Sequence, residues 1–243
     1  MSANTPIRTA MVMAAGHGTR MRPLTDDRSK AMVEVAGKTL IDHMLDRLAE
    51  AGITKAVVNV HAYADHLEAH LKARSDGLEI VISDERDALL ETGGGVVKAL
   101  PLLGEAPILI CNIDAVWAEF APVIPALIDA WDEDEMCDLF LLAPARDCLG
   151  YAGRGDFDMD RMGQLTRRSG PRADWVYAGV QIFTPARARG YPVEPFSRNR
   201  IWDKTLGRGR VFGLPIPGYW MHVGDPGAVK AAEAVLAEHD TPV

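Results

Sequence analysis

The chain has 243 residues, of which 48% are hydrophobic and 25% are charged, and its net charge is −8 at neutral pH. This is the composition of a globular protein, and we expect one domain over residues 1–243 because no linker-like stretch divides the chain. The acidic balance argues against a nucleic-acid surface, since neutralising backbone phosphates requires a clustered excess of Lys and Arg.

The first nine residues are polar and lack the apolar core of a signal peptide, and nowhere do about 18 apolar residues run together. We therefore expect a cytoplasmic protein without membrane contact. The three cysteines, Cys111, Cys137 and Cys148, form no C-x-x-C pair, which fits a reducing compartment. Cys111 lies in an apolar run, where a buried, unreactive thiol is expected.

Strands and helices alternate through the first half of the chain. The apolar run 10–15 is too short for a typical helix and ends at a glycine, which predicts a buried strand. Residues 40–51 carry apolar side chains at helical spacing before Gly52, which predicts a helix. The alternation continues with predicted strands at 56–60, 78–82 and 108–111 and predicted helices at 63–73 and 95–100.

This alternation predicts an α/β fold, a Rossmann-like three-layer sandwich with a mostly parallel central sheet. The second half is less regular, and its short strand candidates predict a partly antiparallel extension on the substrate side. They lie at 139–143, 157–159, 176–183 and 211–214, and a terminal helix is predicted at 228–237. Because parallel sheets bind ligands at the carboxyl ends of their strands, we expect the site in the loops that follow the first, second and fourth strands.

The clearest chemical signal is the loop after the first strand, A-A-G-H-G-T-R-M-R-P-L-T at residues 14–25. Its glycines let the backbone approach a ligand and turn N–H groups toward triphosphate oxygens. Arg20 supplies a planar, permanently charged group, and Lys30 is placed to add a second positive charge. The predicted nucleotide-binding residues of this loop are Ala14, Ala15, Gly16, Gly18 and Thr19.

Two commoner phosphate motifs do not fit. The dinucleotide fingerprint requires a third glycine where this chain has Met21. The stretch Gly37-Lys38-Thr39 ends like a P-loop, but the earlier glycine of that motif is replaced by Met32.

The loop, the lysine downstream and the stretch V-A-G-K-T-L-I at residues 35–41 together resemble the sugar-1-phosphate nucleotidyltransferases. The resemblance implies that a sugar-1-phosphate oxygen attacks the α-phosphorus of a nucleoside triphosphate and releases pyrophosphate. Arg20, Lys30 and Mg²⁺ would compensate the developing charge. No general base is required, because a phosphomonoester with a second pKa of about 6 is already ionised. The family usually flanks this lysine with prolines, where this chain has Ser29 and Ala31.

The resemblance also implies a metal ligand at Asp114, directly after the fourth strand. The family's second metal aspartate corresponds to His222, and an imidazole is a poor magnesium ligand. Three explanations are open: Asp114 suffices with substrate phosphates, Asp225 reaches the ion, or catalysis has been lost. Asp225 is expected instead to cap the terminal helix before Pro226. Our hypothesis is an active enzyme in which His222 contacts phosphate or a metal-bound water.

The stretch L-E-T-G-G-G at residues 90–95 corresponds to the family's base-binding turn, and its form resembles the uridylyltransferases for N-acetylmuramate 1-phosphate, enzymes of cell-wall sugar recycling. The predicted base-binding residues are Glu91, Gly93 and Gly94. The predicted sugar-side residues are Asn112, Gly155, Asp156, Tyr177 and Gly179. Either Arg167 or Arg168 is a candidate for the sugar phosphate, and Arg154 or Arg200 for a lactyl carboxylate.

Two alternatives follow from the same residues. One is a guanylyltransferase for mannose or heptose 1-phosphate, and the other is a catalytically silent sugar-nucleotide sensor, motivated by His222. The expected partners are a nucleoside triphosphate and a sugar 1-phosphate, with no nucleic acid or membrane, and the expected assembly is a monomer or small homo-oligomer.

Overall fold

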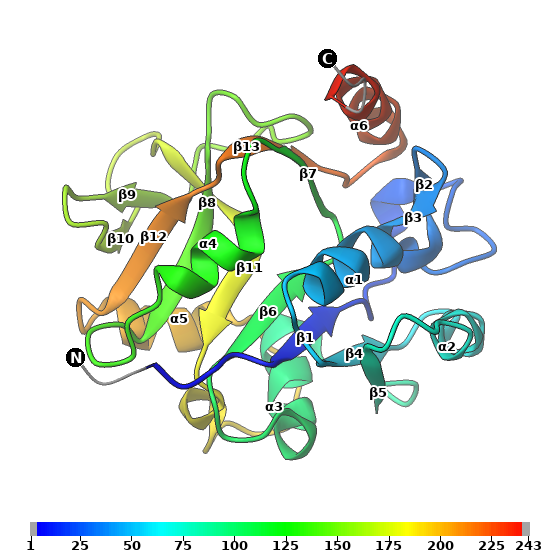
Figure 1. The fold of residues 1–243 in the computed structure, drawn as a ribbon, viewed down its shortest axis with the longest axis horizontal. Coiled ribbons are helices and arrows are strands. Elements are labelled where there is room, and N and C mark those ends of the chain that lie inside the picture. Colours follow the sequence, from blue (N-terminus) through cyan, green and yellow to red (C-terminus); the bar gives the residue numbers. More distant parts are fainter. Residues whose placement is uncertain (1–3, 240–243) are drawn as a thin grey trace.

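The computed structural model describes residues 4–239 (Figure 1). Its centre is a parallel sheet in which β1 (Thr9–Met13) lies between β4 (Lys55–Val60) and β6 (Ile108–Asn112), and β5 (Glu79–Asp84) follows beside β4. These four strands confirm the predicted parallel arrangement, with ends that shift by one or two residues. The first strand ends at Met13, so Ala14 and Ala15 belong to the loop.

The second half of the chain extends this sheet. β11 (Trp175–Phe183) runs antiparallel to β6 and also pairs antiparallel with β8 (Asp138–Pro144). β9 (Phe157–Met159) and β10 (Leu165–Arg167) form an antiparallel pair at one edge, whereas β12 (Val211–Pro215) runs parallel to β8. The predicted partly antiparallel extension is confirmed, with β10 as an additional strand.

Helices cover both faces of the sheet. Side chains alternate along β1, so Ala10 and Val12 join the hydrophobic cluster that contains the buried face of α1 (Leu40–Glu50). Met11 points the other way, into the cluster that contains Val96 of α3 (Glu91–Leu103). The three-layer sandwich is therefore confirmed, and Figure 1 shows α1 and α3 beside the central strands.

The predicted helix over 40–51 has clear local causes. The Thr39 hydroxyl accepts a hydrogen bond from the Asp42 amide and caps the first turn. At the other end Gly52 takes a φ of 78°, a conformation that favours glycine and stops the helix.

The other helices are α2 (Ala64–Lys72), α4 (Val123–Asp129), α5 (Asn199–Leu206) and α6 (Pro226–His239). The periodicity did not predict α4 or α5, because both are short. Only Ile201, Trp202 and Thr205 are buried in α5, among exposed polar residues. No helix within residues 4–239 is long and apolar enough to cross a membrane.

A short antiparallel pair, β7 (Ala115–Glu119) and β13 (Gly218–His222), was also not predicted. It forms a two-stranded sheet of its own. In its register His222 pairs with Ala115, the residue after Asp114. A backbone hydrogen bond of 2.9 Å from the Val223 amide to the Asp114 carbonyl continues the contact. This pairing brings the two metal-site candidates together although they lie far apart along the sequence.

Candidate active site

The glycine loop is anchored by a side chain that sequence reasoning missed. Asn59, buried at the end of β4, accepts hydrogen bonds through Oδ1 from the amides of Ala14 and Ala15, at 2.6 and 3.2 Å. Its Nδ2 donates to Oε1 of buried Glu85 at 2.8 Å, which fixes the orientation of the amide. The Ala14 and Ala15 amides are thus already bonded, so any phosphate cradle must be formed by the loop beyond Ala15. The available signal was an asparagine inside the apolar run 56–60.

The two glycines of the loop have different local roles. Gly18 has a φ of 63°, and a Cβ there would lie 2.8 Å from Cβ of Lys30, so glycine is what allows Lys30 to pack against the loop. A Cβ on Gly16, by contrast, would meet nothing within 4 Å, and Gly16 borders an open cavity. Gly16 is therefore the position at which a ligand has room to approach the backbone.

Lys30 is held in place without flanking prolines. It opens the short 3-10 helix η2 (Lys30–Met32), in which the Met32 amide donates to the Ser29 carbonyl and the Val33 amide donates to the Lys30 carbonyl. The side chain reaches Asp114, with Nζ 2.7 Å from Oδ2, and the two side chains are only 11% and 22% exposed. The predicted second positive charge therefore lies at the edge of the sheet, in contact with the predicted carboxylate.

The charges around Asp114 decide its protonation. Burial alone would raise the pKa of Asp114. The positive charge of Lys30, the nearby His222 and the hydrogen bond from Lys30 together outweigh burial, so the pKa of Asp114 lies below its usual value. Nδ1 of His222 lies 3.8 Å from Oδ2 of Asp114. Burial lowers the pKa of His222, and although Asp114 opposes this shift, Lys30 and Arg20 add to it. The site thus pairs an ionised carboxylate with an imidazole that is neutral at pH 7.

Asp225 does not join this group. Its Oδ1 accepts a hydrogen bond of 3.0 Å from the Ala228 amide, which caps α6 as expected from the sequence. Gly224 borders the cavity, and a Cβ there would lie 2.6 Å from Nε2 of His222. The chain therefore places His222, and not Asp225, beside Asp114.

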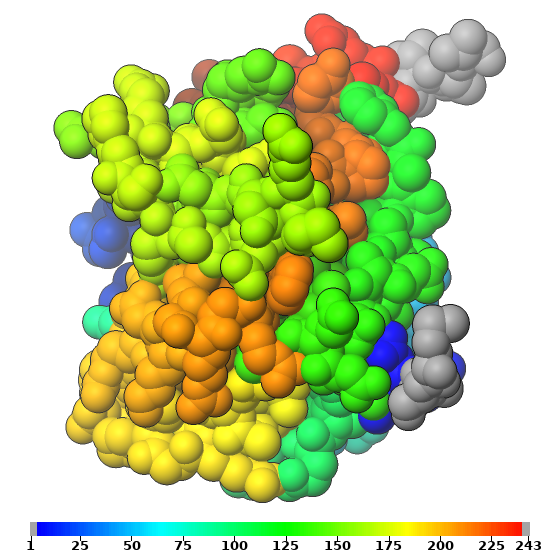
Figure 2. All heavy atoms as spheres, turned by 90° about the vertical axis from the view of Figure 1, so that its left-hand side faces the viewer, coloured from blue at the N-terminus to red at the C-terminus, as the bar shows by residue number. Residues whose placement is uncertain are grey.

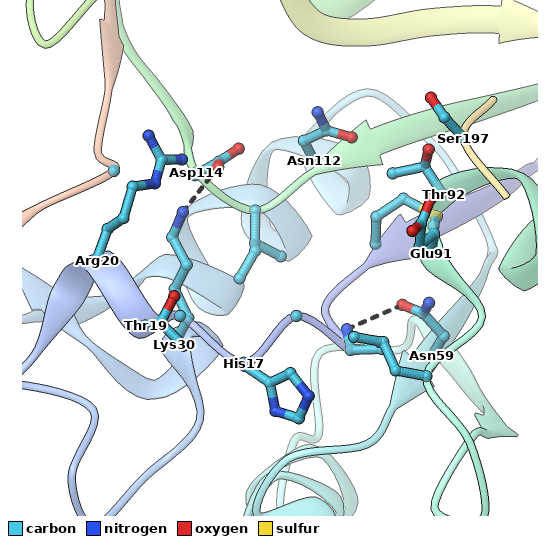
Figure 3. Close-up of a pocket in the computed structure, with 17 residues that line it drawn as sticks. His17, Thr19, Arg20, Lys30, Asn59, Glu91, Thr92, Asn112, Asp114 and Ser197 are labelled. Atoms are coloured by element: carbon cyan, nitrogen blue, oxygen red, sulfur yellow. Dashed lines mark hydrogen bonds and ion pairs between the residues drawn. The ribbon is translucent and has the colours of Figure 1, made fainter. Parts of the chain in front are cut away.

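Two cavities meet at Asn112 and Asp114, which line both. The larger one, about 580 Å³, lies against the glycine loop and the start of α3. Figure 3 shows Arg20 and Lys30 close to Asp114, with Thr92 and Ser197 at the other end. The predicted site residues that line this larger cavity are Ala15, Gly16, Gly18, Thr19, Arg20, Lys30, Glu91, Asn112 and Asp114.

The smaller cavity, about 280 Å³, lies between β11, α5 and β13. The predicted residues that line it are Asn112, Asp114, Asp156, Tyr177, Gly179 and His222. Its wall also includes Tyr151, Arg167, Asn199, Trp202 and Trp220, of which only Arg167 had been singled out from the sequence. An aromatic wall with a few polar groups suits a sugar ring.

Gly93, Gly94 and Gly155 do not line either cavity. A Cβ on Gly93 would lie 2.3 Å from the Phe196 ring, and one on Gly94 would lie 2.1 Å from the Glu194 carbonyl oxygen. Gly155 has a φ of 78° and faces the Ala173 carbonyl. At these three glycines it is therefore another segment of the chain, and not a ligand, that comes close to the backbone.

The docking of residues 194–198 onto α3 completes the larger cavity. The Gly93 amide donates to the Phe196 carbonyl at 2.8 Å, and the Arg198 amide donates to Oγ1 of Thr92 at 2.9 Å. These bonds hold Ser197 at the cavity wall. The Arg198 side chain is buried behind the smaller cavity, where Nη2 donates to the Tyr177 hydroxyl at 3.1 Å.

The arginines considered for the sugar side are separated by the structure. Arg167 lines the smaller cavity, and Nη2 donates to Oδ1 of Asn199 at 2.8 Å and to Asp203 at 2.7 Å. Arg168 bonds the Pro171 carbonyl. Arg154 lines a different cavity, and Arg200 lies over the Phe196 ring, so neither candidate for a carboxylate lines the smaller cavity.

The oxygen atoms of Asn112 and Asp114, where the two cavities meet, suit a hard cation that also binds substrate. Within residues 4–239 no three His, Cys, Asp or Glu side chains gather to hold a metal ion. The junction instead offers the ionised Asp114 and the buried Oδ1 of Asn112, which has no hydrogen-bond partner among the described residues. Magnesium commonly binds one or two carboxylates together with phosphates and waters, so these oxygens fit it.

Comparisons with known proteins identify the family of this chain. Residues 9–146 match the family described as nucleotidyl transferase. The N-acetylmuramate alpha-1-phosphate uridylyltransferase of Caulobacter vibrioides is 51% identical over 236 residues, covering 95% of this chain and 98% of the relative. The protein of that name from Neisseria meningitidis is 32% identical and covers 93% and 97% of the two chains.

The solved inositol-1-phosphate CTP transferase of T. maritima superposes with a TM-score of 0.78 at 18% identity, over 99% of this chain and 100% of that one. This likeness supports the fold, and the sequence relatives support the family. The chain therefore belongs to the nucleotidyl transferase family, among its sugar-1-phosphate nucleotidyltransferases.

Proposed function

We propose that this protein joins UTP to N-acetylmuramate 1-phosphate, giving UDP-N-acetylmuramate and pyrophosphate. The observation that carries this choice of substrates is the 51% identity to the Caulobacter vibrioides uridylyltransferase, which extends over nearly the whole of both chains. The residues that line the two cavities supply a physical account of how the reaction proceeds.

The nucleotide occupies the larger cavity and the sugar phosphate the smaller one, so their reacting groups meet beside Asn112 and Asp114. An ionised phosphate oxygen of the sugar attacks the α-phosphorus, and the bond to the pyrophosphate oxygen breaks. Holding both substrates in line is the main catalytic contribution. Arg20 and Lys30 stabilise the negative charge that gathers on the transferred and leaving oxygens.

Magnesium would be held by Asp114, with Asn112 and substrate phosphates as further oxygen ligands, and would supply positive charge at the phosphates. Lys30, which donates to Asp114 in the free protein, turns to a phosphate oxygen when the nucleotide binds. His222 is neutral and donates a hydrogen bond to phosphate or to a bound water. Arg167 binds an anionic group of the sugar phosphate at the far wall.

The test is a matrix of four nucleoside triphosphates against the 1-phosphates of N-acetylmuramate, N-acetylglucosamine, mannose and a heptose, read by pyrophosphate release. We expect the highest kcat/KM for UTP with N-acetylmuramate 1-phosphate. Preference for GTP with mannose or heptose 1-phosphate would support the guanylyltransferase instead. Nucleotide-induced thermal stabilisation without pyrophosphate from any pair would support a silent sensor.

A further inference from the structure

A third cavity lies away from the two cavities of the active site. Its lining is positively charged, although the protein as a whole is negatively charged. It measures about 400 Å³, and four cationic side chains line it: Arg187, Arg189, Lys204 and Arg208. Within residues 4–239 no carboxylate borders it, although the chain carries a net charge of −8. Figure 2 shows the face on which its two segments, 184–191 in yellow and 201–208 in orange, lie side by side.

Among the described residues, Arg189 is the only one of these four cations that forms an ion pair. Arg189 pairs with Glu105, and Nζ of Lys204 lies 4.6 Å from the centre of the Tyr191 ring. Arg187 and Arg208 form no ion pair with any described residue, and the Arg187 Nε is buried without a hydrogen-bond partner. A buried guanidinium nitrogen without a partner is costly, and an anion would relieve that cost.

We infer that this cavity binds a small phosphorylated molecule and thereby regulates the enzyme. A phosphate ester offers two negative charges and several acceptor oxygens, which suit a pair of arginines beside the hydroxyl-bearing side chain of Thr184. The cavity volume lies in the range of small-molecule sites. A polyanion such as nucleic acid fits poorly, because the rest of this acidic chain would repel it.

Helix α5 connects this basic cavity to the smaller, sugar-side cavity of the active site. One face of the helix contributes Asn199 and Trp202 to the sugar-side cavity. Another face contributes Ile201, Lys204 and Thr205 to the basic cavity. A ligand that shifts α5 from one side therefore shifts the wall of the sugar site.

A buried polar chain provides a second connection. Nε1 of Trp202 donates to Oε1 of Gln181 at 3.1 Å, and Nε2 of Gln181 donates to Oδ1 of Asp138 at 3.2 Å. Asp138 is fully buried, and the positive charge of Arg187 stabilises its ionised form against the larger, opposing effect of burial. An anion bound at Arg187 weakens that stabilisation of the Asp138 carboxylate, and the effect reaches Trp202 through Gln181.

The binding test uses inorganic phosphate and glycerol 2-phosphate as titrants in calorimetry. The active site is first weakened by Arg20→Gln with Lys30→Gln, and we expect the binding heat to persist in that protein. Addition of Lys204→Gln and Arg208→Gln, both outside the buried core, is expected to abolish it. Addition of Arg161→Gln instead, an exposed charge in the turn between β9 and β10, is expected to leave it unchanged. Heat that disappears with Arg20 and Lys30, or persists without Lys204 and Arg208, overturns the site.

The regulatory part rests on the proposed function and is tested separately in otherwise unmodified enzyme. Glycerol 2-phosphate is expected to change the KM for the sugar phosphate about fivefold, with little effect on the KM for UTP. Lys204→Gln with Arg208→Gln is expected to remove this change while keeping activity without effector. An unchanged KM, or an equal change in the double variant, contradicts regulation. Because the calorimetry needs no turnover, failure of the assigned substrates does not affect the binding result.

Discussion

Lys30 and Asp114 form an ion pair with 2.7 Å between Nζ and Oδ2, and Asp114 lines both cavities of the candidate active site. The lysine comes from the glycine-loop region, and the aspartate follows β6, a neighbour of β1. The contact follows from the sheet, because the segments that follow the adjacent parallel strands β1 and β6 lie at the same carboxyl edge.

The first prediction separates the two aspartates near the proposed metal site. Asp114→Ala removes the carboxylate at the junction, and we expect kcat to fall at least about 100-fold. Asp225→Ala removes only the cap of α6, so we expect near-normal kcat and a loss of about 1 kcal/mol in unfolding free energy. Pyrophosphate release and urea denaturation measure the two effects. Unchanged turnover in Asp114→Ala would end the metal assignment.

The second prediction concerns His222. His222→Asp places a carboxylate beside Asp114, and we expect the magnesium concentration for half-maximal activity to fall about tenfold, because added ligand charge strengthens binding of a hard cation. His222→Asn, which adds an amide of similar size without charge, is the control. The comparison is a magnesium titration of pyrophosphate release at a single, slightly alkaline pH. Equal magnesium requirements in the two variants would argue that His222 lies away from the ion.

The third prediction uses two glycines that differ in their surroundings. A Cβ at Gly16 meets nothing within 4 Å, so Gly16→Ala should change the unfolding free energy by less than about 1 kcal/mol while raising the KM for UTP, because the methyl group enters the nucleotide space. Gly93→Ala should destabilise the fold by about 2 kcal/mol or more through its clash with Phe196. A KM for UTP unaffected by Gly16→Ala would show that the loop does not approach the nucleotide.

The fourth prediction concerns the pH dependence of stability. Burial raises the pKa of Asp138 to about 7, against about 3.9 in an unfolded chain. Between these values the folded protein keeps a proton that the unfolded chain has lost, so this carboxyl makes stability fall as the pH rises from about 4 to about 7. Asp138→Asn removes the effect, which is on the order of 4 kcal/mol. Urea denaturation at about pH 5 and about pH 8 should show a flatter dependence in the variant, and parallel curves would contradict the assignment.

The sequence predicted the parts of the site that are local. The glycine loop, Lys30 and Asp114 are short motifs beside strong apolar runs, and each lies where the strand order places it. Asp225 was correctly expected to cap a helix, because a cap depends only on the residues that follow it.

The remaining parts depend on contacts between distant segments. His222 reaches Asp114 through the pairing of β13 with β7, two short strands without a strong pattern. Gly93 and Gly94 suggested a ligand because their sequence could not show that residues 194–196 fill the space above them. Asn59 was missed because a polar residue in a strand reveals its role only when its partners, the amides of residues 14 and 15, are known.

The most direct test is a competition assay. Wild-type protein, Mg²⁺ and N-acetylmuramate 1-phosphate are mixed with equal concentrations of ATP, CTP, GTP and UTP, and the products are identified by mass spectrometry. We predict UDP-N-acetylmuramate as the main product, formed in equal amount with pyrophosphate and lost in Asp114→Ala. A different nucleotide in the main product, or a nucleotide sugar formed equally well by Asp114→Ala, would contradict the account.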